Sequence, residues 1–142
     1  MAARTLDLQF DVMNARTDSD LETAFATLSQ QHVGAVLVSV SNFYISRREQ
    51  LTALAARYAL PAIFPYREHA LAGGLMSYGI NVDFFWHQIG ILTGRILKGE
   101  KPANLPVEQS VKFELTLNLK TAKALGLTIP ETLLATADEV IQ

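Results

Sequence analysis

Ser77 is the residue whose surroundings most suggest catalysis, because glycines stand on both sides of it in the segment GGLMSYG. A nucleophilic serine of the Gly-x-Ser-x-Gly type needs a glycine two residues before it and two after it, since both glycines permit a strained turn from strand to helix. Gly79 has the required position, but Gly74 lies one residue too far away. The spacing therefore argues against a serine nucleophile.

The sequence also lacks the other common catalytic and cofactor-binding motifs. His32, His69 and His87 form no HxH or HExxH pair, so no metal site is predicted. The chain has no cysteine, which excludes thiol nucleophiles and disulfides. Neither GxGxxG nor GxxxxGK[ST] is present, and no cofactor is predicted. One enzymatic hypothesis stays open, a small hydrolase or isomerase that uses His69 or His87 with Glu68.

Aromatic, amide and charged residues follow three predicted strands at the point where each strand ends. The carboxyl ends of parallel strands share one edge of a sheet, and open α/β sheets bind ligands at that edge. We therefore expect a ligand-binding rim rather than a nucleophile, with Ser77, Tyr78 and Gly79 forming a turn within it. The expected rim residues are Asn42, Phe43, Tyr66, Glu68, Ser77, Tyr78 and Gly79.

The elements that position this rim alternate between strand and helix. Residues 6–12 and 112–119 alternate apolar and polar side chains, as strands with one buried face do. Residues 33–40 and 61–66 are apolar runs typical of strands covered on both faces. Helices are predicted in the intervening segments and over residues 131–142. The order β-α-β-α-β-α-β-α-α predicts a three-layer α/β sandwich with a mostly parallel sheet.

Local signals place the predicted helices more closely. Ser19 and Glu22 have the spacing of a capping box. The helix predicted over residues 83–98 carries Gly90 and Gly94 on one face, which favours close packing against a sheet or another helix. Its apolar stripe is expected in the core and contains Phe85, Ile89, Leu92 and Ile96. Gly99 is expected to end this helix with a positive φ, and Gly126 to end a later, shorter one.

Composition indicates one globular domain without a nucleic-acid partner. The chain has 142 residues, of which 49% are hydrophobic and 18% charged. A net charge of −2 provides no basic surface for nucleic acid. The first residues lack the basic and apolar regions of a secretory signal, and no apolar run reaches the ~20 residues that span a bilayer. As written, the chain is expected to stay in the cytoplasm.

Three stretches together resemble a known family. They read PAIFPYREHALAGGLMSYG, GRILKGEKPANLPVEQ and KFELTLNLKTAKALGLTIPETLLATADEVI. They closely resemble ABC-transporter substrate-binding proteins with the type I periplasmic-binding-protein fold, from about Leu6 to Ile141. The resemblance implies a non-catalytic, periplasmic protein that binds a small solute, such as an amino acid, between two lobes and delivers it to an ABC permease.

The resemblance also implies a division of the chain, because members of this family are about twice as long and carry a signal peptide. Residues 1–100 then correspond to most of the second lobe. Residues 101–142 correspond to a connector, with Pro102 and Pro106 in the hinge, followed by segments that pack on the first lobe. Without that lobe, an apolar face is expected to drive dimerisation or segment exchange. This face contains Phe113, Leu115 and Leu117.

In the same way, the resemblance suggests roles for the rim. Tyr78 and Phe43 would stack on an apolar or aromatic solute, and Glu68 would bind an ammonium group. Asn42 and the backbone amide of Gly79 would bind a carboxylate. A few such polar groups in an apolar cleft are typical of small-molecule sites.

A second hypothesis needs no ligand at all. It describes an α/β domain that acts only through self-association, and the missing signal sequence favours it for the chain as written. The dipeptide Trp86-His87 stands where related proteins commonly have Tyr-Arg, so any role of that arginine is not carried over to this chain.

Overall fold

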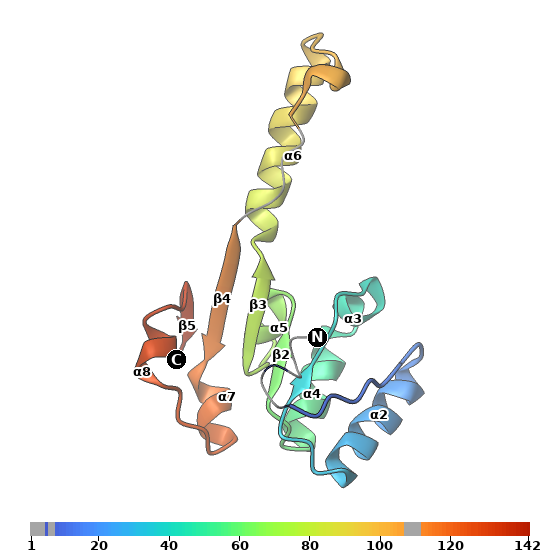
Figure 1. The fold of residues 1–142 in the computed structure, drawn as a ribbon, viewed down its shortest axis with the longest axis vertical. Helices are drawn as coiled ribbons and strands as arrows, with labels where there is room; N and C mark the ends of the chain where they lie inside the picture. The colour runs from blue at the N-terminus through green and yellow to red at the C-terminus, as the bar shows by residue number, and fades with distance from the viewer. Residues whose placement is uncertain (1–4, 6–7, 107–111) are drawn as a thin grey trace.

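A single five-stranded sheet forms the body of the protein (Figure 1). The computed structural model describes residues 5, 8–106 and 112–142. Strand order in space follows the sequence, and every neighbouring pair is parallel except β3 and β4. The predicted α/β fold with a mostly parallel sheet is confirmed. The strands are β1 (Val36–Leu37), β2 (Ala62–Phe64), β3 (Met76–Ile80), β4 (Phe113–Asn118) and β5 (Glu139–Ile141).

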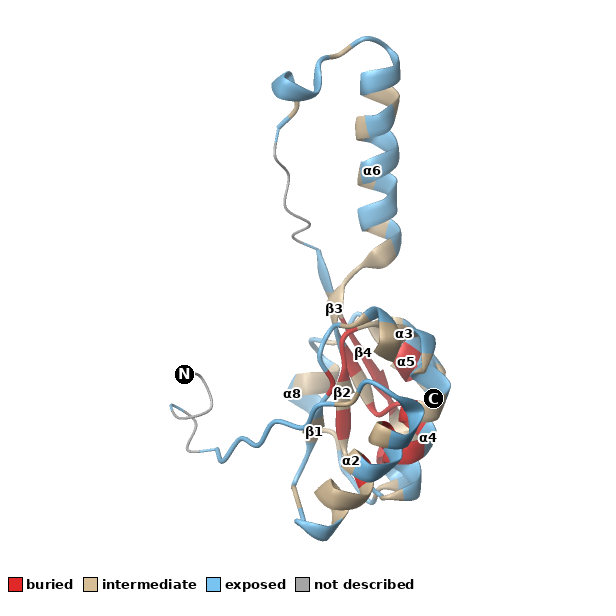
Figure 2. Cartoon of the chain, turned by 90° about the vertical axis from the view of Figure 1, so that its right-hand side faces the viewer, coloured by how far each residue is buried: buried red, intermediate tan, exposed pale blue. Residues whose placement is uncertain are grey.

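Helices connect these strands, and α2, α4 and α5 lie together on one side of the sheet (Figure 2). A short 3-10 helix, Pro102–Asn104, follows the longest of them. The helices are α2 (Asp18–Gln30), α3 (Asn42–Ser46), α4 (Arg48–Arg57), α5 (Arg67–Leu71), α6 (Val82–Leu97), α7 (Leu119–Ala124) and α8 (Glu131–Leu134). The bounds of α6 match the prediction within one residue, and Gly99 has the expected positive φ of 98°.

The N-cap of α2 lies two residues before the predicted cap, Ser19. Thr17 is the N-cap, and its Oγ1 accepts a hydrogen bond from the Asp20 backbone N–H at 3.2 Å. The Asp20 carboxylate in turn accepts from the Thr17 backbone N–H at 2.9 Å. Threonine and aspartate make this reciprocal pair as serine and glutamate do, so two overlapping caps compete and the earlier one forms.

The core lies between the sheet and the helices on its covered side. In β2, Ala62 and Phe64 face the helices, while Ile63 between them faces the other way, as alternation along a strand requires. Helix α4 contributes Leu51 and Leu54, which are 1% and 3% exposed, to this core. The buried cluster consists of Leu21, Phe25, Val38, Leu51, Leu54, Ala55, Leu60, Ala62 and Phe64.

The strand predicted over residues 6–12 does not form in the described part of that segment. Residues 8–17 pair with no strand, and Leu8, Phe10 and Val12 remain 60%, 64% and 68% exposed. Residues 6 and 7 lie outside the described range. Alternation alone does not make a strand, because the backbone also needs a hydrogen-bonding neighbour. In the described part of the chain, the nearby strand β1 pairs only with β2.

The C-terminal segment also differs from its prediction. The helix expected over residues 131–142 ends at Leu134, and the chain returns to the sheet as β5. The Asp138 backbone N–H donates to the Leu115 carbonyl at 2.9 Å, and the Leu115 N–H donates to the Asp138 carboxylate at 2.8 Å. Pairing with β4 therefore overrides the helical pattern of this segment.

The apolar face of β4 is not orphaned, contrary to expectation. Leu115 and Leu117 are 9% and 1% exposed, and only Phe113 at the start of the strand is half exposed. Because β4 pairs with β3 on one side and β5 on the other, it belongs to the same body as the earlier strands. This strand alone gives no reason for segment exchange.

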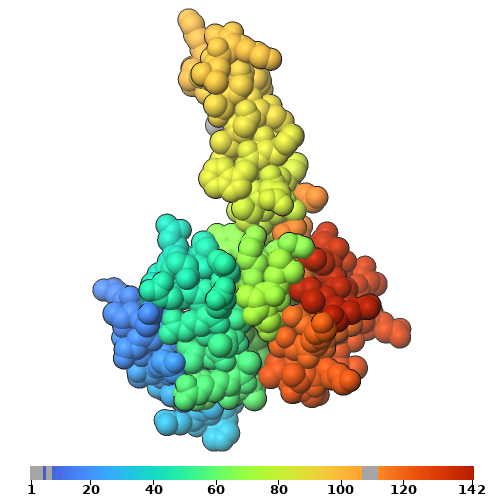
Figure 3. All heavy atoms as spheres, turned by 180° about the vertical axis from the view of Figure 1, so that it is seen from behind, coloured from blue at the N-terminus to red at the C-terminus, as the bar shows by residue number. Residues whose placement is uncertain are grey.

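Helix α6 carries the unpartnered apolar surface instead. It extends away from the sheet (Figure 1), and Figure 3 shows it standing clear of the body. None of its residues is buried, so the prediction that its apolar stripe lies in the core is wrong for all four residues, Phe85, Ile89, Leu92 and Ile96. The expected boundary at residue 100 falls in the short segment between α6 and the 3-10 helix. Among the described residues, no helix is long and apolar enough to cross a membrane.

Candidate ligand-binding site

The carboxyl ends of β1, β2 and β3 lie at one edge of the sheet, because these three strands are parallel. Asn42 begins α3 after β1, and Arg67 begins α5 after β2. The end of β3 approaches the second of these turns closely. An ideal Cβ on Gly79 would lie 1.9 Å from the carbonyl oxygen of Pro65. The third predicted cluster therefore contacts Pro65, the residue directly before the second cluster.

The first cluster presents one polar and one aromatic side chain. Asn42 is exposed at the first residue of α3, with its amide available to a ligand. Phe43 is half-buried and packs against the core. The guanidinium carbon of Arg47 lies 5.5 Å from the centre of the Phe43 ring, a cation–π distance. Arg47 also pairs with Asp18 at 2.7 Å, which fixes this corner to α2.

The second cluster lies at the start of α5. Tyr66 is the N-cap residue and is half-buried, while Glu68 is exposed with its carboxylate in solvent. Between them, Arg67 makes a two-pronged ion pair with Glu139 of β5, with Nη2 2.7 Å from Oε1. This hydrogen-bonded pair raises the pKa of Arg67. Arg67 was not among the predicted site residues, because its partner Glu139 becomes a neighbour only when β5 pairs with the sheet.

The third cluster is a strand and not the predicted turn. Ser77, Tyr78 and Gly79 belong to β3 and pair with β4. Successive side chains of a strand point to opposite faces. Ser77 is therefore buried, with no hydrogen-bond partner for its hydroxyl among the described residues, while Tyr78 is 56% exposed and stacks on Phe113 at 5.8 Å. The two side chains cannot share one ligand-facing surface.

The joint between the body and the α6 arm adjoins this rim. Asn81 caps α6, and its Oδ1 accepts from the Phe84 N–H at 2.7 Å. Its Nδ2 donates to the Glu114 carboxylate at 2.6 Å. This hydrogen bond links the segment that leads into α6 with strand β4, where the chain returns to the sheet. Pro102 and Pro106, the predicted hinge residues, lie beyond α6 and away from this joint (Figure 1). An asparagine directly before a helix was the available signal for the cap.

His69 lies beneath the rim and supports the second cluster. Its side chain is 1% exposed and stacks on Phe64 with ring centres 5.0 Å apart. Its Nδ1 lies 3.3 Å from the Tyr66 carbonyl oxygen. Burial lowers the pKa of His69, and the Tyr66 carbonyl beside Nδ1 opposes this effect only in part. The imidazole thus packs against the rings of Phe64 and Tyr66 beneath the second cluster.

We expect the buried histidine to make the fold less stable in mild acid. Well above pH 6.5, the ordinary pKa of histidine, the imidazole is neutral in the unfolded chain as well as in the folded one, and its contribution to stability is complete. As the pH falls below that value, the unfolded chain binds a proton that the folded chain does not, so the free energy of unfolding decreases by up to ~1.4 kcal/mol per pH unit. Urea unfolding followed by circular dichroism at a series of pH values measures this slope.

The matched variants are His69→Asn and His87→Asn. The first removes the buried titrating group and should reduce the slope between about pH 6.5 and 5. The second changes an exposed residue of α6 and should leave the slope as it is in the unaltered chain. Identical slopes in all three proteins would contradict the assignment to His69.

Comparison with known proteins identifies related structures. A family model described as ABC transporter substrate binding protein matches residues 1–141. A conserved domain protein from Vibrio cholerae has 22% sequence identity and a TM-score of 0.86, and the match covers 98% of this chain and 47% of that one. An ABC domain from Streptococcus pneumoniae in complex with L-Trp has 25% identity and a TM-score of 0.86, with coverage of 98% and 48%.

A third structure is more distant. The ligand-free, open form of a substrate-binding protein with adhesive properties from Clostridium difficile has 19% identity and a TM-score of 0.66, with coverage of 99% and 47%. No curated protein sequence matches the chain. The chain spans about half the length of each structure that it resembles.

Proposed function

Since the chain belongs to the family of ABC transporter substrate-binding proteins, we propose that it forms part of the solute-binding site of an ABC-type importer and has no catalytic activity. The observation that carries the proposal is the family match over residues 1–141, with the rim at the carboxyl ends of β1, β2 and β3 as its structural counterpart. The permease of the importer is the proposed partner, and the periplasm is the proposed compartment.

The proposed solute is an amino acid with an aromatic or large apolar side chain. L-Trp is bound in the related structure from Streptococcus pneumoniae. In this chain, the exposed carboxylate of Glu68 is suited to an ammonium group, and the exposed amide of Asn42 to a carboxylate. Phe43, Tyr66 and Tyr78 would provide aromatic contacts. Ser77, whose side chain is buried, would support the site only by packing inside the fold, and Gly79 would contact the solute through its backbone.

The rim forms only one wall of such a site. Solute-binding proteins that close by hinge motion enclose their ligand between two lobes. The related structures contain about as many residues again as match this chain, and we propose that such a second part provides the opposite wall. The arm formed by α6 would pack on that part. The hinge would then lie where the chain leaves and re-enters the body, at residues 80–82 and 112–114, and not at Pro102 and Pro106.

Titration with amino acids tests the proposal. L-Trp is expected to raise the melting temperature, and a solute at about 100 times its Kd stabilises the folded state by ~2.7 kcal/mol. Replacing Glu68 with glutamine removes a charged hydrogen bond of ~1.5–3 kcal/mol, so the Kd from isothermal titration calorimetry should rise about tenfold or more. Glu131→Gln, at an exposed position of α8, is the matched control and should leave the Kd unchanged.

Two outcomes would contradict the proposal. The first is that no aromatic or branched amino acid stabilises the chain. The second is that Glu131→Gln weakens binding as much as Glu68→Gln does.

Self-association without a ligand is the second candidate function, and the exposed apolar surface of α6 favours it. Trp86 and Leu97 in this helix are 61% and 82% exposed. A stable dimer by analytical ultracentrifugation that is insensitive to amino acids would support this second function.

A further inference from the structure

The first residue of β5 lies at the same edge of the sheet as the solute-binding rim. Strand β4 runs antiparallel to β3, and β5 runs parallel to β4, so β5 begins where β1, β2 and β3 end. In the register, Glu139 pairs with Thr116 of β4, which pairs with Ser77 of β3. Partners in a ladder share one face of the sheet, so Glu139 belongs to the row that contains the predicted rim residue Ser77.

Helix α5 cannot hold its own first turn in place. It has five residues, whereas isolated helices shorter than about 12 residues are marginal in water. The first N–H groups of a helix have no partner within it, and in the described structure the N-cap residue Tyr66 makes no side-chain hydrogen bond to them. This turn positions Tyr66 and Glu68 of the rim, so the order of the rim depends on contacts between α5 and the rest of the fold.

The two ends of α5 are held by different contacts. Three side chains from other elements donate hydrogen bonds to carbonyls at or just beyond its C-terminal end. They are Asn118 to Ala70 at 3.0 Å, Thr52 to Ala72 at 3.0 Å and Thr121 to Gly73 at 2.8 Å. The first turn is held by the ion pair in which Nε and Nη2 of Arg67 both donate to the Glu139 carboxylate. Two parallel hydrogen bonds fix the orientation of a guanidinium as well as its position.

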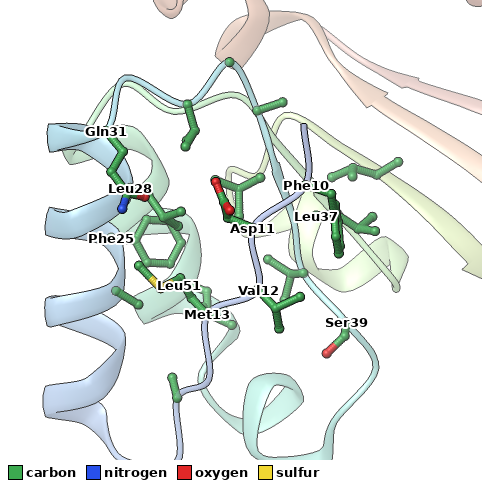
Figure 4. Close-up of a pocket in the computed structure, with 18 of the residues that line it drawn as sticks. Phe10, Asp11, Val12, Met13, Phe25, Leu28, Gln31, Leu37, Ser39 and Leu51 are labelled. Carbon is green, nitrogen blue, oxygen red and sulfur yellow. The ribbon is translucent and has the colours of Figure 1, made fainter. Parts of the chain in front are cut away.

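This ion pair lies outside the apolar groove that the body carries beyond β1 (Figure 4). The groove has a volume of about 950 Å3, and Phe10, Val12 and Leu37 are among the residues that line it. Neither Arg67 nor Glu139 lines the groove, and none of the predicted rim residues does. The ion pair therefore acts on the rim and not on this groove.

We propose that Glu139 is a positioning residue of the solute-binding rim. By holding the Arg67 guanidinium, it orders the first turn of α5 and so places the Tyr66 ring and the Glu68 carboxylate where a solute meets them. The pair acts through the rim and not by contact with the solute. This inference rests on the proposed function, but its first test needs no ligand.

Hydrogen exchange in Glu139→Gln is the first test. Glutamine keeps the size of the side chain and removes the charge that holds Arg67. The His69 N–H donates to the Tyr66 carbonyl at 3.1 Å across the first turn, so its exchange, measured by NMR, should become about fivefold faster. The Gly74 N–H donates to the His69 carbonyl at 2.8 Å at the other end of α5, and its exchange should change less.

The matched control breaks an ion pair of the same kind elsewhere. Arg95 and Glu100 also make two hydrogen bonds, and their side chains are 40% and 34% exposed, compared with 41% and 34% for Arg67 and Glu139. Glu100→Gln should therefore leave exchange at His69 as it is in the unaltered chain. Arg67→Glu alone should speed this exchange, and Arg67→Glu combined with Glu139→Arg should slow it again, because the pair is restored with its charges reversed.

Solute binding is the second test. The Kd of L-Trp, measured by isothermal titration calorimetry, is expected to rise about fivefold in Glu139→Gln, because ordering the first turn then adds to the cost of binding. Glu100→Gln should leave the Kd unchanged. Circular dichroism confirms that the variants are folded.

Two results would overturn the inference. One is equal exchange at His69 in Glu139→Gln and in the unaltered chain, and the other is an unchanged Kd in Glu139→Gln despite faster exchange. If the unaltered chain bound no amino acid, that result would contradict the proposed function, and the exchange comparison would still decide whether Glu139 orders the first turn of α5.

Discussion

Replacing Leu117 with alanine is expected to lower the free energy of unfolding by about 2–5 kcal/mol, which is the range for a buried leucine. Its side chain is 1% exposed in the middle of the sheet, where its strand pairs with β3 and β5. Alanine would leave a cavity, because backbone on both sides is held by ladder hydrogen bonds and cannot collapse into the space. Urea unfolding measured by circular dichroism gives the change directly.

The control for this prediction is the same substitution at Leu97. That leucine is 82% exposed near the end of α6, so alanine there should change the free energy of unfolding by no more than about 0.5 kcal/mol. The comparison separates two descriptions of the C-terminal segment. If β4 were orphaned, as its sequence suggested, the two variants would be equally mild, and that result would contradict the structure.

Gly79→Ala is the second change with a large expected effect. The new Cβ would lie 1.9 Å from the carbonyl oxygen of Pro65 and 2.9 Å from the carbonyl carbon. Both are backbone atoms, so no side-chain rotation relieves the overlap, and either β3 or the turn before α5 must move. We expect a loss of about 3 kcal/mol or more. Because this contact joins two parts of the rim, solute binding should also be weakened in any folded fraction.

Gly90→Ala is the matched control for that substitution. Apart from its chain neighbours and the nearby backbone of its own helix, no atom lies within 4 Å of the position its Cβ would occupy, and the residue lies inside α6. Alanine is a better helix former than glycine by ~1 kcal/mol, so this variant should be slightly stabilised or unchanged. Unfolding of Gly79→Ala at the same urea concentration as the unaltered chain would contradict the close contact.

Gly90 also bears on the interpretation of α6. The spacing of Gly90 and Gly94 predicted close packing, yet neither position meets another atom within 4 Å in this chain. Glycines that let a helix approach a neighbour, together with exposed Trp86 and Leu97, indicate a packing surface whose partner is not among the described residues. This agrees with the proposal that the arm packs on a second part of a family-length protein.

The local features of this protein were determined by the sequence alone. The ends of α6, the positive φ of Gly99 and the end of α7 just before Gly126 were predicted correctly. These features depend on interactions within a few residues, such as helical periodicity and the absence of a Cβ in glycine. The resemblance to substrate-binding proteins likewise depended on contiguous motifs, and the family match confirms it.

Only the tertiary structure decided which segments pair and which faces are covered. Residues 8–12 have the pattern of a strand but lack a neighbour, whereas residues 139–141 have a helical context but pair with β4. In the rim, the strand ladder places Ser77 and Tyr78 on opposite faces, and Arg67 meets Glu139 across the fold. The physical reason is that strand hydrogen bonds and burial are satisfied between distant segments, so a local pattern cannot specify its own partner.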